Sequence, residues 1–143
     1  MTIEDILRFD NILYGEDEKW QILDVYKPKS AEGKLPVIVN VHGGGWVYGT
    51  KEVYQFYCMS LAQMGFAVVN YNYRLAPENK FPSSVEDTNS VFNWIEKNQN
   101  EYGFDCNNVF AVGDSAGANL LALYAAILTN AELKKKYDFN LPS

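Results

Sequence analysis

Two glycine-containing segments carry the residue types that acyl-transfer chemistry requires, and the first contains a serine. Gly113-Asp114-Ser115-Ala116-Gly117 fits the pattern Gly-x-Ser-x-Gly and lies between an apolar run and an Ala- and Leu-rich stretch. A serine hydroxyl is a weak nucleophile, so it must project from a sharp turn where a base can reach it and where a helix N-terminus favours negative charge. The glycines permit that turn because they lack side chains that would collide with the adjoining strand and helix. Ser115 is the candidate nucleophile, although the pattern taken alone fits equally well a helix N-cap serine after a glycine turn.

The second segment is His42-Gly43-Gly44-Gly45-Trp46, which follows an earlier apolar run. Acyl transfer builds negative charge on the substrate carbonyl oxygen, and each fixed backbone N–H group that stabilises it is worth about 3 to 4 kcal/mol. Glycines let the backbone approach that oxygen closely. The alternative is a flexible glycine loop without a ligand.

Together the two segments predict an oxyanion hole formed by Gly43, Gly44, Gly45 and Ala116. The N–H groups of Gly44, Gly45 and Ala116 are the expected donors, and Gly43 shapes the loop. His42 and Asp114 are expected to support the loop, His42 by hydrogen bonding.

Phosphate binding is the competing use of a glycine-rich loop between a strand and a helix. Gly44 and Gly49 have the Walker A separation, but Thr50-Lys51 reverses the required order of Lys and Ser/Thr. The dinucleotide-binding pattern fails because Tyr48 occupies the position of its third glycine. The sequence therefore disfavours nucleotide binding.

Apolar runs alternate with helical patterns along the chain, which predicts an α/β fold with a mostly parallel sheet between two helical layers. Gly65 is expected to end the first helix, and Ser83 and Glu86 have the spacing of a capping box at the start of the second. Four strands are expected at residues 20–26, 35–41, 66–71 and 108–113, with helices at residues 53–64, from 83 onward and at 116–128.

Composition describes an ordinary globular chain and excludes several function classes. The 143 residues are 48% hydrophobic and 21% charged, and the net charge of -6 disfavours nucleic acid as a partner. The first ten residues lack the basic and apolar regions of a signal peptide, no membrane span is indicated, and Cys58 and Cys106 are compatible with a reducing cytoplasm. Neither a metal nor an organic cofactor is expected.

The two glycine-containing segments belong to a larger set of motifs that runs along most of the chain: residues 23–28, 42–46, 73–78, 81–82 and 113–119, together with Asp87. With these motifs the chain resembles the hormone-sensitive-lipase-like family of α/β-hydrolases, which contains carboxylesterases and lipases acting on acyl esters. Ala118 departs from the resemblance, where the family usually has a second glycine. The resemblance implies that Arg74, Glu78 and Asp87 support the loops around the site.

In this fold the triad follows the chain order serine, acid, histidine, yet the single histidine precedes Ser115. Glu132 and Asp138 are the only acids after Ser115, and both fall in a polar helical tail, too early for the family's acid. We therefore expect residues 1–143 to form the N-terminal part of one α/β-hydrolase domain, without the C-terminal strands that bring the acid and the histidine. Such a fragment is expected to be inactive, and a complementing C-terminal segment or a homo-oligomer would cover its sheet edge.

Two functions are consistent with these residues. The first is a serine carboxylesterase or lipase that forms an acyl-enzyme on Ser115. The second is a non-catalytic ligand-binding module, or truncated pseudo-hydrolase, on the same scaffold. Four aromatic residues after the glycines could line an acyl or alcohol pocket or simply pack in the core: Trp46, Tyr48, Tyr54 and Phe56.

Overall fold

The computed structural model describes residues 3–143; Met1 and Thr2, the start of the segment considered for a signal peptide, lie outside them. The strands are β1 (Ile6–Leu13), β2 (Ile22–Pro28), β3 (Leu35–Val41), β4 (Ala67–Tyr71) and β5 (Phe104–Gly113). The helices are α1 (Gln55–Gln63), α2 (Ser83–Lys97), α3 (Gln99–Tyr102), α4 (Ala116–Thr129) and α5 (Ala131–Tyr137), with 3₁₀ turns η1 (Ile3–Asp5) and η2 (Lys51–Tyr54).

The strands form one mixed sheet in the order β1-β2-β4-β3-β5. β3 pairs in parallel with both β4 and β5, whereas β2 is antiparallel to β1 and to β4. The predicted α/β class is confirmed, and the parallel part of the sheet consists of the three strands joined by crossover helices. The N-terminal strands add the antiparallel pairs.

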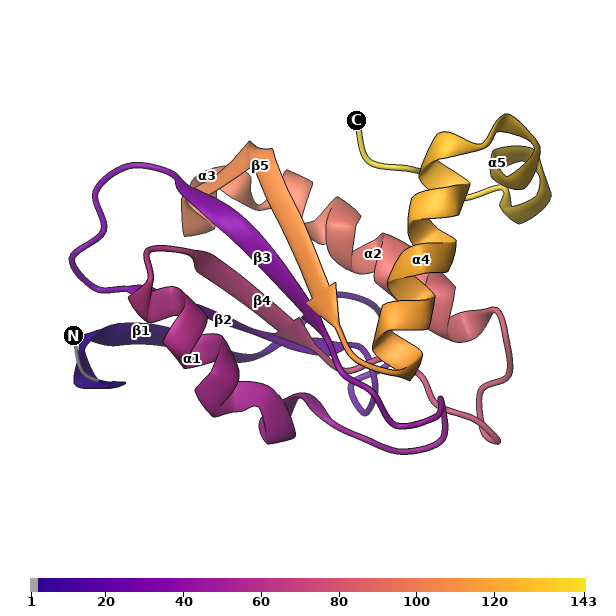
Figure 1. Cartoon of the computed structure of the whole chain (residues 1–143), viewed down its shortest axis with the longest axis horizontal. Coiled ribbons are helices and arrows are strands. Elements are labelled where there is room, and N and C mark those ends of the chain that lie inside the picture. Colours follow the sequence, from indigo (N-terminus) through magenta and orange to yellow (C-terminus); the bar gives the residue numbers. More distant parts are fainter. Residues whose placement is uncertain (1–2) are drawn as a thin grey trace.

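Helices cover both faces of this sheet, which gives the expected three layers (Figure 1). α1 packs on one face through Cys58, Met59 and Ala62, which contact Tyr26 and Val68. The larger core lies on the other face, where α2 and α4 pack against the central strands. Across residues 3–143, no helix combines the length and the apolar character that a bilayer crossing requires.

Two local features differ from the sequence-based expectation. β1 was not predicted, because it is an edge strand in which only Ile6 is buried, so it lacks a regular apolar pattern. The prediction of a capping box is wrong, because Ser83 is the first residue of α2 and not its N-cap. The Ser83 Oγ donates to Lys80 O at 2.6 Å. Glu86 instead accepts a hydrogen bond from Arg74.

The parallel strands bring three loops to one end of the sheet. Val41, the last residue of β3, is level with Tyr71 at the end of β4 and with Gly113 at the end of β5. The segments that follow these residues therefore meet, although they are far apart in sequence (Figure 1). Ligands of open α/β sheets bind at this end of the strands.

Candidate active site

Ser115 lies in the tight turn between β5 and α4, which we call the serine turn (residues 113–117). Its backbone has φ 48° and ψ −116°, and the residue is exposed. A side chain at positive φ costs about 1 to 3 kcal/mol and persists only where the surrounding structure imposes it. The serine turn thus stores backbone strain at the residue with the candidate nucleophile.

The two glycines of the serine turn are required by contact with β3 and α4. A Cβ atom on Gly113 would lie 2.9 Å from the carbonyl carbon of Gly117 and 3.0 Å from Val41 O. A Cβ atom on Gly117 would overlap Val41 O and lie 2.8 Å from His42 O. Any larger residue at either position would push the turn away from β3.

The first turn of α4 leaves a backbone donor available next to Ser115. The N–H groups of Gly117 and Ala118 donate to Asp114 O at 2.8 and 3.3 Å, and Asn119 N donates to Ser115 O at 3.0 Å. Within residues 3–143, the N–H group of Ala116 has no protein acceptor. The open N–H group and the helix dipole both favour an anion at this point.

The second segment, the glycine loop (residues 42–50), follows β3 and turns back on itself. Gly44 has φ 129° and Gly45 has φ 58°, so both need the freedom of glycine. Gly44 O accepts hydrogen bonds from Val47 N and Tyr48 N, both at 3.1 Å. In the part of the chain that is described, the N–H groups of Gly44 and Gly45 donate to no protein group.

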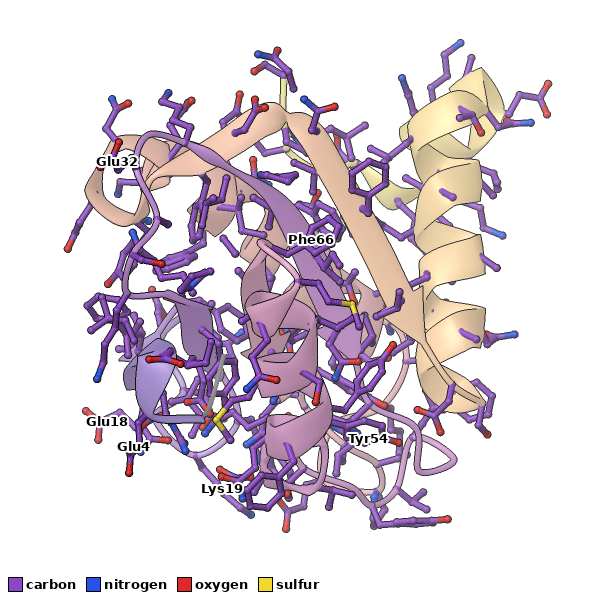
Figure 2. The ribbon with its side chains drawn as sticks, turned by 60° about the vertical axis from the view of Figure 1, so that its left-hand side comes forward. Glu4, Glu18, Lys19, Glu32, Tyr54 and Phe66 are labelled. Carbon is purple, nitrogen blue, oxygen red and sulfur yellow. The ribbon has the colours of Figure 1, made fainter. Side chains whose placement is uncertain are left out.

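A carboxylate joins the glycine loop to the serine turn. Asp114 Oδ1 accepts a hydrogen bond from Gly43 N at 3.0 Å and another from the Tyr54 hydroxyl at 2.7 Å. Tyr54 lies just before the N-terminus of α1, whereas Phe66 follows the C-terminus of the same helix (Figure 2). Burial and the bond to Asp114 raise the pKa of Tyr54, which keeps its hydroxyl protonated as a donor. The structure therefore brings Gly43, Asp114 and Ser115 together, and it adds Tyr54, which we expected from the sequence only to line a pocket or pack in the core.

His42 is buried at the base of the glycine loop. Its Nδ1 lies 2.7 Å from Gly43 O, its ring stacks on Tyr73 with centroids 4.2 Å apart, and the Tyr73 hydroxyl donates to His42 O at 2.8 Å. Because a carbonyl only accepts, Nδ1 carries the proton. Burial lowers the pKa of His42 and favours the neutral ring. Its Nε2 has no hydrogen-bond partner in residues 3–143, so it does not contact the Ser115 hydroxyl.

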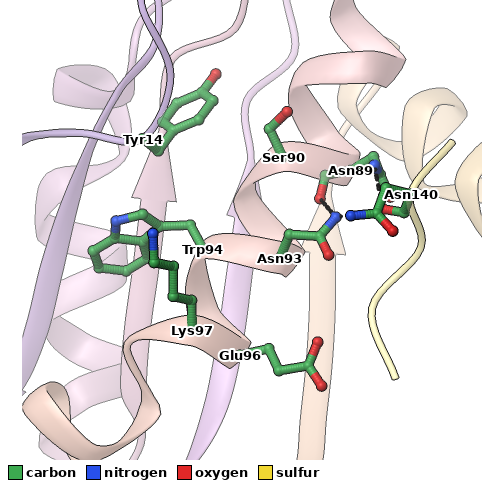
Figure 3. A pocket seen from close by; sticks show the side chains of 8 residues that line it. All are labelled: Tyr14, Asn89, Ser90, Asn93, Trp94, Glu96, Lys97 and Asn140. Atoms are coloured by element: carbon green, nitrogen blue, oxygen red, sulfur yellow. Dashed lines mark hydrogen bonds between the residues drawn. The ribbon is translucent and has the colours of Figure 1, made fainter.

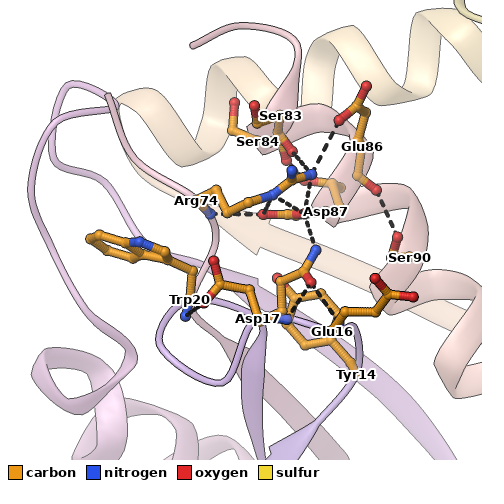
Figure 4. Close-up of polar contacts among 12 residues, drawn as sticks. Tyr14, Glu16, Asp17, Trp20, Arg74, Ser83, Ser84, Glu86, Asp87 and Ser90 are labelled. Atoms are coloured by element: carbon orange, nitrogen blue, oxygen red, sulfur yellow. Dashed lines mark hydrogen bonds and ion pairs between the residues drawn. The ribbon is translucent and has the colours of Figure 1, made fainter. Parts of the chain in front are cut away.

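Arg74 and Asp87 hold the loop after β4 against α2 (Figure 4). Asp87, which has no exposed surface, accepts from the Arg74 backbone N–H at 2.7 Å and from its guanidinium at 2.8 to 3.1 Å. Gln21 Nε2 also donates to Asp87, at 2.7 Å. The hydrogen bonds that Arg74 donates to Asp87 raise the pKa of Arg74. Glu78 lies outside this network and forms an exposed ion pair with Lys19 at 2.8 Å.

A cavity of about 330 Å³ lies beside the glycine loop, between it, the segment after β4 and α4. Gly45, Trp46 and Asn119 are among its lining residues. Tyr48 and Phe56 are 69% and 63% exposed, so core packing is excluded for them. Trp46 O also accepts from Ala76 N at 2.9 Å, which joins the two loops that border the cavity.

A larger cavity of about 620 Å³ lies along α2 (Figure 3). Its lining residues, including Asn93, Trp94 and Asn140, contain none of the residues that the sequence singled out for chemistry. Asn93 Nδ2 donates to Asn140 O at 2.7 Å across one side of it. The volume of a cavity alone therefore does not identify the candidate active site. Among residues 3–143, no group of three or more His, Cys, Asp or Glu side chains is arranged to hold a metal ion.

Comparison with known proteins identifies the family of the chain. The model of the BD-FAE family matches residues 23–142. The chain belongs to the BD-FAE family. Its relatives include the esterase LipC of Mycobacterium tuberculosis, which is 35% identical over 133 residues, 92% of this chain and 32% of that protein. The carboxylesterase NlhH of the same species is 35% identical over 123 residues, covering 85% of this chain and 39% of the relative.

Solved structures of esterases are similar to this BD-FAE family chain over almost its whole length. Esterase B of Lactobacillus rhamnosis superposes with a TM-score of 0.91 and 31% identity, over 99% of this chain and 45% of that protein. A complex of the same esterase with a tributyrin phosphonate gives a TM-score of 0.92. The chain is thus an α/β-hydrolase of the hormone-sensitive-lipase-like type, as its motifs predicted. It spans less than half the length of these relatives.

Proposed function

We propose that this chain carries the nucleophile and the oxyanion hole of a serine carboxylesterase or lipase acting on small acyl esters. The observation that supports this most is the exposed, positive-φ Ser115 at the start of α4, beside a glycine loop that Asp114 ties to the same turn. Ser115 would attack the ester carbonyl, and water would later release the acyl group from the acyl-enzyme. This reaction needs no metal and no organic cofactor.

The backbone donors of the proposed oxyanion hole are the N–H groups of Gly44, Gly45 and Ala116. All three lack a protein acceptor among residues 3–143, so they are available to the negative oxygen of a tetrahedral intermediate. The N–H group of Gly43 already donates to Asp114, so Gly43 holds the loop in position and does not bind the oxygen. His42 supports the same loop through its bond to Gly43 O.

The general base and its acid are proposed to come from outside the 143 residues. His42 is buried and its Nε2 forms no hydrogen bond with Ser115 or any other group of residues 3–143, while Glu132 and Asp138 are exposed at α5. We therefore expect residues 1–143 alone, the N-terminal part of the domain, to hydrolyse esters at no more than the residual rate that the oxyanion hole and binding provide.

The free edge of β5 is the proposed contact for the segment that completes the triad. Within the described residues β5 pairs with β3 alone, and its Phe110 is 54% exposed. An unpaired strand with exposed apolar side chains invites another strand. The complementing strands would come from the same polypeptide or from a second copy of it.

A cytoplasmic location is part of the same proposal. Cys58 and Cys106 are both free thiols, as a reducing compartment favours. The substrate is proposed to be an acyl ester of small size, and the net charge of -6 argues against nucleic acid as a partner.

Fluorophosphonate labelling tests the proposal in the full protein as its gene encodes it. We expect one covalent adduct on the peptide that contains Ser115, and steady hydrolysis of p-nitrophenyl acetate. Ser115→Ala removes both, whereas Ser60→Ala, at an exposed serine of α1 that donates to Phe56 O, retains both. Hydrolysis by the Ser115→Ala protein at the wild-type rate would refute the proposal, and a wild-type protein that binds esters without reacting would favour the binding module.

A further inference from the structure

A buried cation lies directly after the glycine loop. Lys51 is 2% exposed, and its ammonium group contacts Asp24 Oδ1 at 2.8 Å, Glu52 Oε1 at 2.8 Å and Asn11 Oδ1 at 2.9 Å. An ammonium group has three N–H donors, so each has an acceptor. The side chain therefore has one defined position.

The carboxylate that pairs with Lys51 is fixed in the same way. Asp24 Oδ1 also accepts from Asn11 N at 2.8 Å, and Asp24 Oδ2 accepts from the Tyr26 hydroxyl at 2.9 Å. Burial on its own would lower the pKa of Lys51, but Asp24 and Glu52 outweigh it and raise the pKa. The ammonium group stays charged at neutral pH.

The backbone of Lys51 is held as firmly as its side chain. Its N–H donates to Asn72 Oδ1 at 2.6 Å, and its carbonyl accepts from Asn70 Nδ2 at 2.8 Å. Asn70 in β4 accepts in turn from Asn40 Nδ2 in β3, at 3.0 Å. Lys51 is thus attached directly to β4 and, through Asn70, to β3, near the C-terminal ends of both strands.

Gly49, two residues before Lys51, packs against the start of the glycine loop. Gly49 has φ 103°, and a Cβ atom on it would lie 2.7 Å from His42 Nδ1 and overlap Gly43 O. The returning part of the loop therefore touches the part that leaves β3. On the other side of Lys51, η2 leads to Tyr54 and its bond to Asp114.

A buried ion pair is a weak source of stability, because apolar residues of similar volume often serve as well. Its defined geometry is better explained by a need to fix a nearby segment. We propose that Lys51 is a positioning residue for the oxyanion hole, which anchors the glycine loop to β2, β3 and β4 so that the N–H groups of Gly44 and Gly45 keep one direction. The proposal rests on the function proposed above for those two groups.

The test compares Lys51→Met with Lys27→Met in the full protein. Lys27 is a matched control, since its ammonium group also makes a partly buried bond, to Tyr102 O at 2.8 Å, away from the glycine loop. For Lys51→Met we expect kcat for p-nitrophenyl acetate to fall about 10- to 100-fold, as when a bond to a charged group is lost, with KM within about threefold. Lys27→Met should keep the wild-type kcat below its unfolding temperature.

Amide hydrogen exchange supplies a readout that needs no catalysis. Lys51→Met should speed exchange at Gly43 and Tyr48 in the glycine loop, and leave Gly117 in the serine turn unchanged. Loss of exchange protection at all three amides together would indicate general destabilisation and overturn the proposal, as would an unchanged kcat in a folded Lys51→Met protein. If wild-type protein shows no Ser115-dependent hydrolysis, the proposed function fails, while the exchange pattern still decides whether Lys51 positions the loop.

A second variant covers the case in which Lys51→Met does not fold because Asp24 is left as an unpaired buried charge. The double variant Lys51→Met/Asp24→Asn removes that charge, and its amide oxygen can still accept from Asn11 N. We expect it to fold and to show the same loss of kcat. Wild-type kcat in the folded double variant would refute the positioning role.

Discussion

The serine turn and the glycine loop lie side by side but are held in shape by different forces. The serine turn is fixed by steric exclusion, because β3 leaves no room for a Cβ atom on Gly113 or Gly117. The glycine loop is fixed by polar contacts with distant parts of the chain: Asp114 and Tyr73 bond to the loop itself, and Asn72 bonds to Lys51 directly after it.

This difference has a physical consequence for how each element tolerates substitution. A steric constraint is local and absolute, so one added methyl group should disrupt the serine turn. A set of hydrogen bonds is distributed, so each bond that is lost should loosen the glycine loop by a limited amount. The four predictions that follow test this contrast, in order of expected effect.

The largest effect is expected from Gly117→Ala. The new Cβ atom would overlap Val41 O, so the free energy of unfolding should fall by about 3 kcal/mol, at the upper end of overpacking costs. Urea denaturation measures this. Gly65→Ala is the control, because Gly65 has φ 100° but no atom within 4 Å of an added Cβ, so only the backbone strain of positive φ, about 1 to 2 kcal/mol, applies. Equal losses in the two variants would contradict steric exclusion.

Asp114→Ala should loosen the glycine loop without unfolding the protein. It removes the acceptor of both Gly43 N–H and the Tyr54 hydroxyl. Because hydrogen bonds to charged groups contribute about 1.5 to 3 kcal/mol, exchange of the Gly43 amide should accelerate about 10- to 100-fold. Asp105→Ala, at the opposite end of β5, should leave that amide unchanged. A Gly43 amide equally protected in Asp114→Ala would show that this carboxylate does not hold the loop.

Tyr54→Phe should have a smaller effect in the same direction. It removes one of the two bonds to Asp114 and leaves the bond from Gly43 in place. Loss of about 1 kcal/mol corresponds to roughly fivefold faster exchange at Gly43. Tyr57→Phe is the matched control, since the Tyr57 hydroxyl makes no hydrogen bond within residues 3–143 and the residue is about half exposed. The hydroxyl of Tyr54 has no role in the loop if the two variants behave alike.

The smallest effect concerns the titration of His42. Burial lowers its pKa, so the unfolded chain takes up a proton before the folded chain as the pH falls through the ordinary histidine range. The folded state is therefore expected to lose stability from about pH 6.5 downward, until the lowered pKa is reached. Because the chain has one histidine, NMR of the imidazole measures the pKa without ambiguity. A pKa at or above the ordinary value, or a proton on Nε2, would contradict the described loop.

The sequence predicted the serine turn far better than the contacts of the glycine loop. Gly113 to Gly117 form one short segment whose spacing expresses a local steric requirement, and α4 begins at Ala116 as predicted. Tyr54 and Lys51 act on the glycine loop through partners 60 and 27 residues away, Asp114 and Asp24. Such pairs leave no periodic or spacing signal in a single sequence.

The buried carboxylate of Asp24 did carry one usable signal. It shares a face of β2 with apolar residues, and a buried carboxylate requires a cation. The need for a cation predicts a lysine or arginine beside Asp24, but it does not identify Lys51 among the basic residues of the chain. The pairing of β1 with β2 could not be predicted from the sequence either, since β1 is an exposed edge strand.

The most direct test of the whole account is the crystal structure of the full protein after reaction with a phosphonate ester. We expect phosphorus bonded to Ser115 Oγ, with the phosphoryl oxygen about 2.7 to 3.1 Å from the backbone nitrogens of Gly44, Gly45 and Ala116. A phosphoryl oxygen that points to solvent, or an adduct on another residue, would contradict the proposed nucleophile and its oxyanion hole.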